Sequence, residues 1–267
     1  MKVVEPKVYL ISRPCLDTEG LRSFLVDERI SHWSWESPAD QFGTNKGDAQ
    51  ALPEIAGRLC YMSFGNPRPG GNKAYLDHIL AVGHGSVLEH SNFGFIITGV
   101  SRSFTHELVR HRVGMSYSQL SQRYVDESQA NFVMPSVFLR PGLDSLRKMW
   151  EDVVSAAQEF YQRIVGHLNE HFKDVPDPTA RKKAARQAAR SVLPNATETK
   201  IFVTANVRAW RHFIEMRCSA AAEPEIRQVA GMILKVLQQE APNLFGDYLW
   251  TVSDDGTEVV STLNRKV

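Results

Sequence analysis

The pattern that most constrains the fold is a run of apolar residues between positions 146 and 168. They recur at spacings of three and four, and they are Leu146, Trp150, Val153, Ala157, Phe160, Ile164 and Leu168. Because an α-helix completes a turn every 3.6 residues, these side chains share one face of a helix of about 27 residues that begins at Asp144. This is the clearest amphipathic helix in the chain.

Shorter patterns predict the other elements. Alternating apolar residues at 92–100 indicate a strand with both faces covered, and the apolar run at 8–12 indicates a short buried strand. Further strands are expected at 131–134 and 200–204. Helices are expected at 17–28, 53–61, 73–83, 181–191 and 207–217, with a last long helix from Glu223-Pro224, and loops at 32–50 and 63–71. Ser101 or Ser103 is expected to cap the helix that carries an Arg-His-Arg run at 110–112.

The composition is ordinary for a globular protein. The 267 residues are 43% hydrophobic and 23% charged, and the formal net charge of +1 disfavours nonspecific nucleic-acid binding. The three cysteines form no CxxC pair, so neither a disulfide framework nor a cysteine zinc site is indicated. No stretch approaches the roughly 18 apolar residues of a membrane span. We predict a single cytoplasmic α+β domain, 1–267, of mostly long helices around a small mixed or antiparallel sheet, with no function assigned to residues 1–50.

Cationic and hydroxyl side chains gather after the strand predicted at 92–100. The Arg-His-Arg run at 110–112 is followed by Ser116, Ser118, Ser121 and Arg123. Burying unpaired charges is costly, whereas arginine forks match phosphate oxygens bidentately. The cluster therefore predicts a site for a phosphorylated ligand, although a solvated helix face is the alternative for any single arginine.

Other chemistries have weaker support. His84 and His90 share no helical face, and His167 and His171 lack a third ligand, so no metal site is predicted. No base is placed beside Ser121, and no Gly-x-Ser-x-Gly, Gly-x-Gly-x-x-Gly or Walker sequence occurs. Neither a serine nucleophile nor a Rossmann or P-loop cofactor site is therefore indicated.

Five ordered segments resemble the motifs of the flavin-dependent thymidylate synthases. They are Gly83-His84-Gly85-Ser86-Val87-Leu88-Glu89-His90, Arg110-His111-Arg112 with Ser121-Gln122-Arg123-Tyr124, Arg190-Ser191-Val192-Leu193-Pro194, Asn206-Val207-Arg208 with His212-Phe213 and Arg217, and Glu225-Ile226-Arg227. The resemblance covers roughly residues 50–245. One residue more than the family usually has stands between Arg-His-Arg and Ser121, so Gly114 or Met115 is expected to loop out.

The resemblance implies a reaction and an assembly. Members of this family methylate dUMP to dTMP with carbon from 5,10-methylenetetrahydrofolate and reduce it through FAD with NADPH. They need no covalent enzyme nucleophile, and they form homotetramers with active sites between subunits. Neither a membrane nor, as the main partner, a nucleic acid is expected.

The resemblance also assigns residues. Arg217 is expected to activate the uracil ring, because a guanidinium that keeps its proton stabilises negative charge beside N3 and a carbonyl oxygen. The residues expected to bind FAD are His84, Ser86, Arg110, His111, Arg112, Gln119, Asn206, Arg208 and His212, with Cys60 and Ser63 nearby. Those expected to hold dUMP are Glu107, Leu108, Arg110, Gln119, Leu120, Ser121, Gln122, Arg123, Arg190 and Arg217.

Two other functions stay open. One is an RNA- or DNA-binding module built on the basic segment 181–190 and the Arg-His-Arg run, whose affinity would fall steeply with salt. A solvated helix face is the better-supported interpretation of 181–190. The other is a catalytically dead flavoprotein, because of the extra residue before Ser121.

Overall fold

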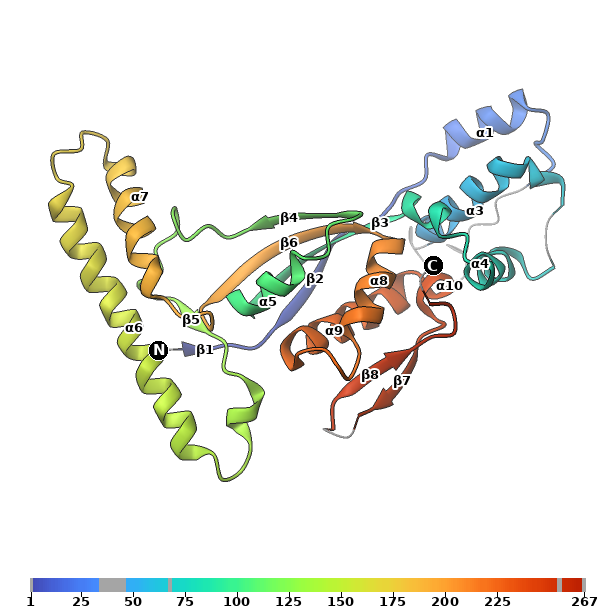
Figure 1. Ribbon diagram of the computed structural model, residues 1–267. Coiled ribbons are helices and arrows are strands. Elements are labelled where there is room, and N and C mark those ends of the chain that lie inside the picture. The colour runs from blue at the N-terminus through green and yellow to red at the C-terminus, as the bar shows by residue number, and fades with distance from the viewer. Residues whose placement is uncertain (1, 34–46, 67–68, 254–255, 266–267) are drawn as a thin grey trace. The chain divides into compact units, whose positions relative to one another are not determined.

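The computed structural model describes residues 2–33, 47–66, 69–253 and 256–265, and there it confirms the α+β class. The largest sheet has four strands in the order β2-β3-β6-β4, namely Lys7–Ser12, Asn92–Ser101, Glu198–Asn206 and Met115–Gln119 (Figure 1). Two smaller sheets pair β1 (Lys2–Val3) with β5 (Asn131–Phe132) in parallel and β7 (Leu249–Val252) with β8 (Glu258–Ser261) antiparallel.

The chain divides into two compact units. Unit 1 comprises Met1–Lys7, Ile97–Arg110 and Tyr117–Phe202, and unit 2 comprises Val8–Ile96, His111–Ser116 and Val203–Val267. All four strands of the largest sheet contribute residues to both units. The single domain expected over 1–267 stays a prediction.

In unit 1, the long helix α6 (Asp144–His171) packs against α7 (Pro178–Ala189) (Figure 1). Tyr161 and Val165 of α6 form a buried cluster with Ala189. The amphipathic helix is confirmed, but its apolar stripe is only partly covered in the single chain. Leu146, Met149, Val153 and Phe160 are exposed. Unit 1 also holds α5 (Arg102–Leu108) and the 3-10 turns η4 (Ser136–Leu139) and η5 (Arg190–Val192).

Unit 2 is mainly helical. Its helices are α1 (Thr18–Asp27), α3 (Asp48–Tyr61), α4 (Gly71–Val82), α8 (Val207–Arg217), α9 (Pro224–Glu240) and α10 (Pro242–Phe245), with 3-10 turns η2 (Ser63–Gly65) and η3 (Gly85–His90). The apolar face of α9 is buried, and α9 packs against α8 and α10. Asp17 begins α1, because its carboxylate accepts from the amides of Glu19 and Gly20.

A buried ion pair ties α8 to the C-terminal segment of unit 2. The fully buried Arg211 binds Asp247 through both Nη atoms, at 2.7 and 2.8 Å, and also donates to the carbonyls of Leu244 and Asn264. Burial would raise the pKa of the Asp247 carboxyl. Hydrogen bonds from Arg211 and from neighbouring side chains outweigh burial and hold that pKa below its ordinary value.

Most predicted elements are present, and three expectations need correction. The strand predicted as buried at 8–12 is largely exposed, with Tyr9 at 47% and Ile11 at 52%. Helix α3 begins at Asp48, earlier than predicted. Ser101 caps α5, as one alternative predicted, but α5 ends at Leu108 and does not carry residues 110–112. The loop predicted at 32–50 falls mostly outside the described residues.

The early end of α5 has a local cause. The amide of Val109 bonds to the carbonyl of Thr105, and the amide of Arg110 turns back to the carbonyl of Glu107 at 3.2 Å. This three-residue bond tightens the last turn and ends the helix. Arg110 therefore begins a connecting segment that reaches β4 at Met115.

Candidate functional site

Helix α8 carries three of the predicted site residues, Arg208, His212 and Arg217, and the end of β6 fixes where it begins. The Asn206 side chain accepts from the amide of Ala209 at 2.8 Å, which is an N-cap. The amide of Asn206 donates to the carbonyl of Gly114, and the amide of Val207 donates to that of Ser91. The Asn206 side chain, predicted to bind FAD, thus has a structural task in unit 2.

Gly114 stands at the point where the extra residue was expected to loop out. Its φ is +71°, and a Cβ at this position would lie 2.6 Å from Nδ2 of Asn206. Both the backbone conformation and the packing therefore require glycine. Of the two positions expected to loop out, Gly114 occupies the turn, and Met115 begins β4.

Residues of two distant motifs line one cavity in unit 2. The cavity of about 300 Å³ is lined by His84, Ser86 and Arg208, and also by Gly57, Cys60, Tyr61, Ile79, Gly83, Gly85 and Val87. Arg208 forms an ion pair with Glu89 at 2.7 Å, and both side chains are about half exposed. The structure thus brings together three residues predicted to contact the cofactor.

A second cavity of about 530 Å³ shares Tyr61, Ile79 and His84 with the first. Its other lining residues are Arg58, Ser63, Asn66, Tyr75 and His78. Arg58 is buried, pairs with Glu54 at 2.7 Å, and donates to the carbonyl of Ser63. Sequence analysis missed Arg58, Tyr75 and His78. The only sequence signal was the Glu54–Arg58 spacing of four, which pairs side chains on one helix face.

His111 lies against the face of α8. Its ring centroid is 5.3 Å from that of Phe213 and 5.8 Å from that of His212, both in edge-on arrangements. Arg217, at the end of the same helix, donates from Nε to Nε2 of His111 at 3.0 Å. The structure thus joins the predicted activating residue to a predicted cofactor contact. Arg112, the neighbour of His111, is exposed.

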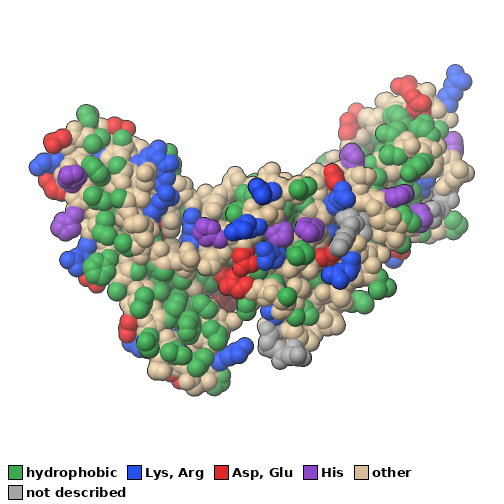
Figure 2. Space-filling model, viewed as in Figure 1, with side chains coloured by type: hydrophobic (Ala, Val, Ile, Leu, Met, Phe, Trp, Pro, Cys, Tyr) green, Lys and Arg blue, Asp and Glu red, His purple; other side chains and the backbone are tan. Residues whose placement is uncertain are grey.

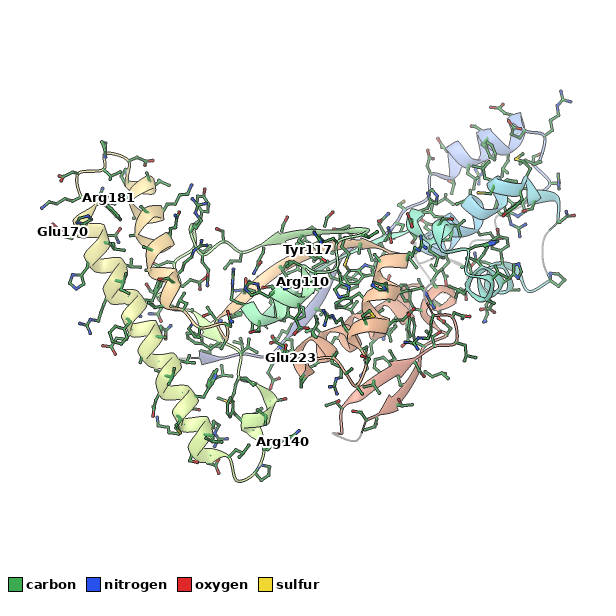
Figure 3. All side chains as sticks on the ribbon, in the orientation of Figure 1. Arg110, Tyr117, Arg140, Glu170, Arg181 and Glu223 are labelled. Carbon is green, nitrogen blue, oxygen red and sulfur yellow. The ribbon has the colours of Figure 1, made fainter. Side chains whose placement is uncertain are left out.

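In unit 1, strand β4 and helix α5 place several predicted dUMP residues. Leu108 is fully buried, and its carbonyl accepts from the Tyr117 hydroxyl at 3.0 Å. Burial raises the pKa of Tyr117 to about 12, so this hydroxyl keeps its proton. Figure 3 labels Arg110 just after α5 and Tyr117 in β4. Gln119 donates to the hydroxyls of Thr105 and Thr199.

The turn after β4 holds the next four predicted residues. The amide of Leu120 donates to the carbonyl of Lys200, and the carbonyl of Ser121 accepts from the amides of the residues three and four further on. Gln122 is buried. The Nε of Arg123 is also buried, and it has no hydrogen-bond partner within the described ranges. A buried donor of this kind favours an external partner, and an anion is the natural one.

Arg190 begins η5, directly after α7, and lies near Arg102. Burial lowers the pKa of Arg102; Glu127 opposes this, whereas the positive charge of Arg190 adds to it. Two neighbouring guanidinium groups with one carboxylate favour an anion. Arg102 was seen as one of several arginines in the sequence, but it was not assigned to the site.

The predicted residues therefore separate by unit. Most dUMP candidates belong to unit 1, and His84, Ser86, His111, Arg112, Asn206, Arg208 and His212, predicted for FAD, belong to unit 2. Arg110 and Gln119, predicted for both ligands, belong to unit 1. Arg217 belongs to unit 2.

The basic face of α7 is partly occupied by contacts within unit 1. Figure 2 shows lysine and arginine side chains gathered over this helix. Lys183 lies 4.7 Å from the ring of Tyr124, and Arg186 pairs with Asp126. Within the described ranges, no group of three or more metal-binding side chains comes together, and no helix is long and apolar enough to cross a membrane.

Comparison with known proteins identifies the family. Residues 44–243 match the Thy1 family, described as thymidylate synthase complementing protein. The chain is 49% identical over 239 residues to the flavin-dependent thymidylate synthase of Mycobacterium tuberculosis strain H37Rv, which covers 87% of this chain and 93% of the relative. It is 50% identical over 234 residues to the enzyme of the same name from Mycobacteroides abscessus, which covers 86% and 92%. The chain therefore belongs to the Thy1 family, the family of the flavin-dependent thymidylate synthases.

Proposed function

We propose that this chain is a flavin-dependent thymidylate synthase that converts dUMP to dTMP, with 5,10-methylenetetrahydrofolate as carbon donor and NADPH as reductant. The relatives that match most of its length are named flavin-dependent thymidylate synthase. The observation that carries the proposal is the cavity of about 300 Å³ where His84 and Ser86 of one motif meet Arg208 of another, more than a hundred positions away.

The residues around that cavity fit FAD. Arg208 offers a charged fork to phosphate oxygens, and Ser86 and His84 offer polar atoms to the rest of the molecule. Gly83 and Gly85 leave backbone without side chains in the cavity wall, so a flat group can approach closely. When bound, FAD would supply the electron transfer that amino-acid side chains do not perform. The chain's own residues bind and orient it.

Residues of unit 1 suit the dUMP phosphate and ring. Arg123 has a buried Nε without a partner in the described chain, and Arg190 lies beside a second arginine. Charged forks of this kind bind phosphate bidentately. Ser121 and the amide of Gln119 add neutral hydrogen-bonding groups. We assign phosphate recognition to Arg123, Arg190 and Ser121.

Arg217 is the residue we assign to activation of the uracil ring. A guanidinium keeps its charge at any working pH, so it stabilises negative charge on the ring and raises the nucleophilicity of C5. The proposal needs no protein nucleophile. The half-buried position of Arg217 beside His111 supports the activating role, because a partly desolvated cation acts more strongly than an exposed one.

We also propose that the chain assembles as a homotetramer. An interface on unit 1 is supported by exposed apolar residues of α6 and η4, which are Leu146, Met149, Val153, Phe160, Val137 and Leu139 (Figure 2).

The three cysteines are free, which fits a reducing compartment such as the cytoplasm.

The decisive experiment is spectroscopic and enzymatic. Purified protein should be yellow, and it should oxidise NADPH in a dUMP-dependent way. Arg217→Ala should reduce dTMP formation by about 10²–10³-fold or more, by analogy with loss of one transition-state donor, while flavin binding and folding survive. Arg22→Ala, an exposed arginine on α1, is the matched control.

Three outcomes would count against the proposal. A protein that cannot be loaded with flavin would refute it outright. A protein that binds flavin but never forms dTMP would be a catalytically dead flavoprotein. Wild-type turnover in Arg217→Ala would leave the reaction in place and remove Arg217 from it.

A further inference from the structure

The Arg217–His111 contact fixes the protonation state of the imidazole. Arg217 donates from Nε to Nε2 of His111 across 3.0 Å. A guanidinium has donors only, so the nitrogen that accepts this bond bears no proton. The bond therefore requires a neutral His111 that carries its proton on Nδ1.

Helix α8 holds both partners of this contact. The Phe213 ring packs edge-on against His111, with the centroids 5.3 Å apart, and Arg217 follows Phe213 by four residues on the same helix. Residues four apart share a helix face. One face of α8 therefore supplies both the Phe213 ring that packs against His111 and the Arg217 guanidinium that donates a hydrogen bond to it. His111 is thereby a fixed acceptor beside Arg217.

We propose that neutral His111 is a positioning residue, whose Nε2 holds the Arg217 guanidinium in the orientation that binds and activates the uracil ring. The proposal rests on the proposed function. The contact uses Nε, the donor closest to the helix, and a bond at this atom sets the plane of the whole group. The two Nη groups, which carry the other donors, then have a defined direction for a planar ligand.

The surroundings make this arrangement sensitive to pH. Protonation of His111 would remove the acceptor and put two cations 3.0 Å apart. His212 on α8 lies against the ring, and the arginines at 110 and 112 are neighbours of His111 in the chain. The carboxylate of Glu215, also on α8, acts on Arg211. The affinity for dUMP should therefore fall as the pH is lowered through the range of about 5 to 8 where imidazole titrates.

A double-mutant cycle on dUMP affinity tests the proposal. Binding is measured by calorimetry at saturating FAD for the wild type, His111→Phe, Arg217→Ala and the double variant. His111→Phe removes the acceptor but keeps a flat ring, and it should weaken binding about tenfold or more, as expected for a hydrogen bond to a charged group. In the Arg217→Ala background the same change should have an effect of no more than about twofold. Equal losses in both backgrounds would overturn the proposal.

A conservative variant separates positioning from packing. His111→Gln keeps an acceptor oxygen that cannot take up a proton, so it should retain most of the affinity and lose the decline between pH 8 and pH 6. His106→Gln, an exposed histidine on α5, is the matched control and should leave the pH profile unchanged. An unchanged pH profile in His111→Gln would contradict the proposal.

Flavin content, read from absorbance per subunit, separates the remaining possibilities. If the His111 variants lose flavin affinity but keep normal dUMP affinity at saturating FAD, His111 serves the flavin alone and the positioning proposal is wrong. If the wild-type protein itself does not bind dUMP, the proposed function fails instead.

Discussion

Two regions of the molecule use arginines with a buried Nε in different ways. Arg123 and Arg211 have a buried Nε without a hydrogen-bond partner among the described residues. In the α8–α9 region of unit 2, Arg211 and Arg227 are committed through their Nη atoms, to Asp247 and to backbone carbonyls. In the turn after β4 of unit 1, the Arg123 guanidinium makes no hydrogen bond or ion pair with the described chain.

The difference separates a scaffold residue from a residue of the proposed binding site. A buried cation is costly unless it is paired, and breaking an existing pair leaves the partner uncompensated. Arg211 is paired by the protein itself, so its role is to stabilise the folded chain. Arg123 lacks such a partner, so an external anion is the group that would complete it. Stability and ligand affinity should therefore respond to these two arginines in opposite ways.

The largest effect is expected from Arg211→Ala. The change leaves the partly buried Asp247 without its counter-ion and should lower the free energy of unfolding by about 3–5 kcal/mol. Urea unfolding followed by circular dichroism measures it. Arg22→Ala, which is exposed on α1, is the control and should change stability by less than about 0.5 kcal/mol. A loss below about 1 kcal/mol would mean that Arg211 is not a scaffold residue.

Arg123→Ala should show the opposite behaviour. Its unfolding free energy should stay within about 1 kcal/mol of the wild type, because no pair within the described chain is broken. Its affinity for dUMP should fall about 10–100-fold, as expected for a lost charge-assisted bond to phosphate. Arg140→Ala, labelled in Figure 3 and exposed at the end of η4, is the control and should bind dUMP normally. The comparison breaks down if Arg123→Ala unfolds readily and still binds dUMP as well as the wild type does.

The loss of stability in acid tests the scaffold role of the Arg211–Asp247 pair. Burial alone would raise the pKa of Asp247, but the bonds from Arg211, Thr262 and Asn264 lower it overall. The stability that this carboxylate contributes is therefore complete above its unfolded pKa of 3.8 and is lost as the pH falls through the lower folded value. Asp247→Asn should be less stable than the wild type at pH 7 and should decline less between about pH 5 and pH 2. Parallel curves for the two proteins would show that this pair does not govern the acid response.

The smallest effect is expected from the exposed pair between Arg208 and Glu89. Both side chains are about half exposed, so solvent and salt screen their attraction. Glu89→Gln should change the free energy of unfolding by less than about 1 kcal/mol, and this difference should vanish in high salt. A larger, salt-resistant loss in thermal unfolding would place this pair with the scaffold residues.

Local patterns predicted the helices well. Helix α8 occupies the predicted residues 207–217, because Asn206 is a strong cap, and the stripe from 146 to 168 predicted α6. Sequence patterns failed where hydrogen bonds between backbone groups determine where an element ends. Nothing in the sequence separates Leu108 from Arg110 as the end of α5, since the last turn closes through the backbone carbonyl of Glu107. The four-residue strands β7 and β8 were missed because they are short and partly exposed.

The candidate site was predicted as a set of residues, whereas its geometry was not predicted. The family resemblance named His84, Ser86 and Arg208, but only the folded chain shows that they line one cavity. Arg58 and His78 belong to no motif, so their place in the second cavity could not be foreseen. The Arg217–His111 bond joins residues more than a hundred positions apart, and such long-range pairings leave no local trace.

The wall of the smaller cavity contains a built-in chemical reporter. Cys60 lines this cavity and is exposed, whereas Cys218 is fully buried, and burial raises the pKa of its thiol to about 11. Alkylating reagents attack the thiolate, so at neutral pH they should pass over Cys218. After Cys15→Ser removes the other exposed thiol, labelling would occur at Cys60 alone. The rate at which a dye attaches there would then report occupancy of the cavity in real time, without a substrate and without turnover.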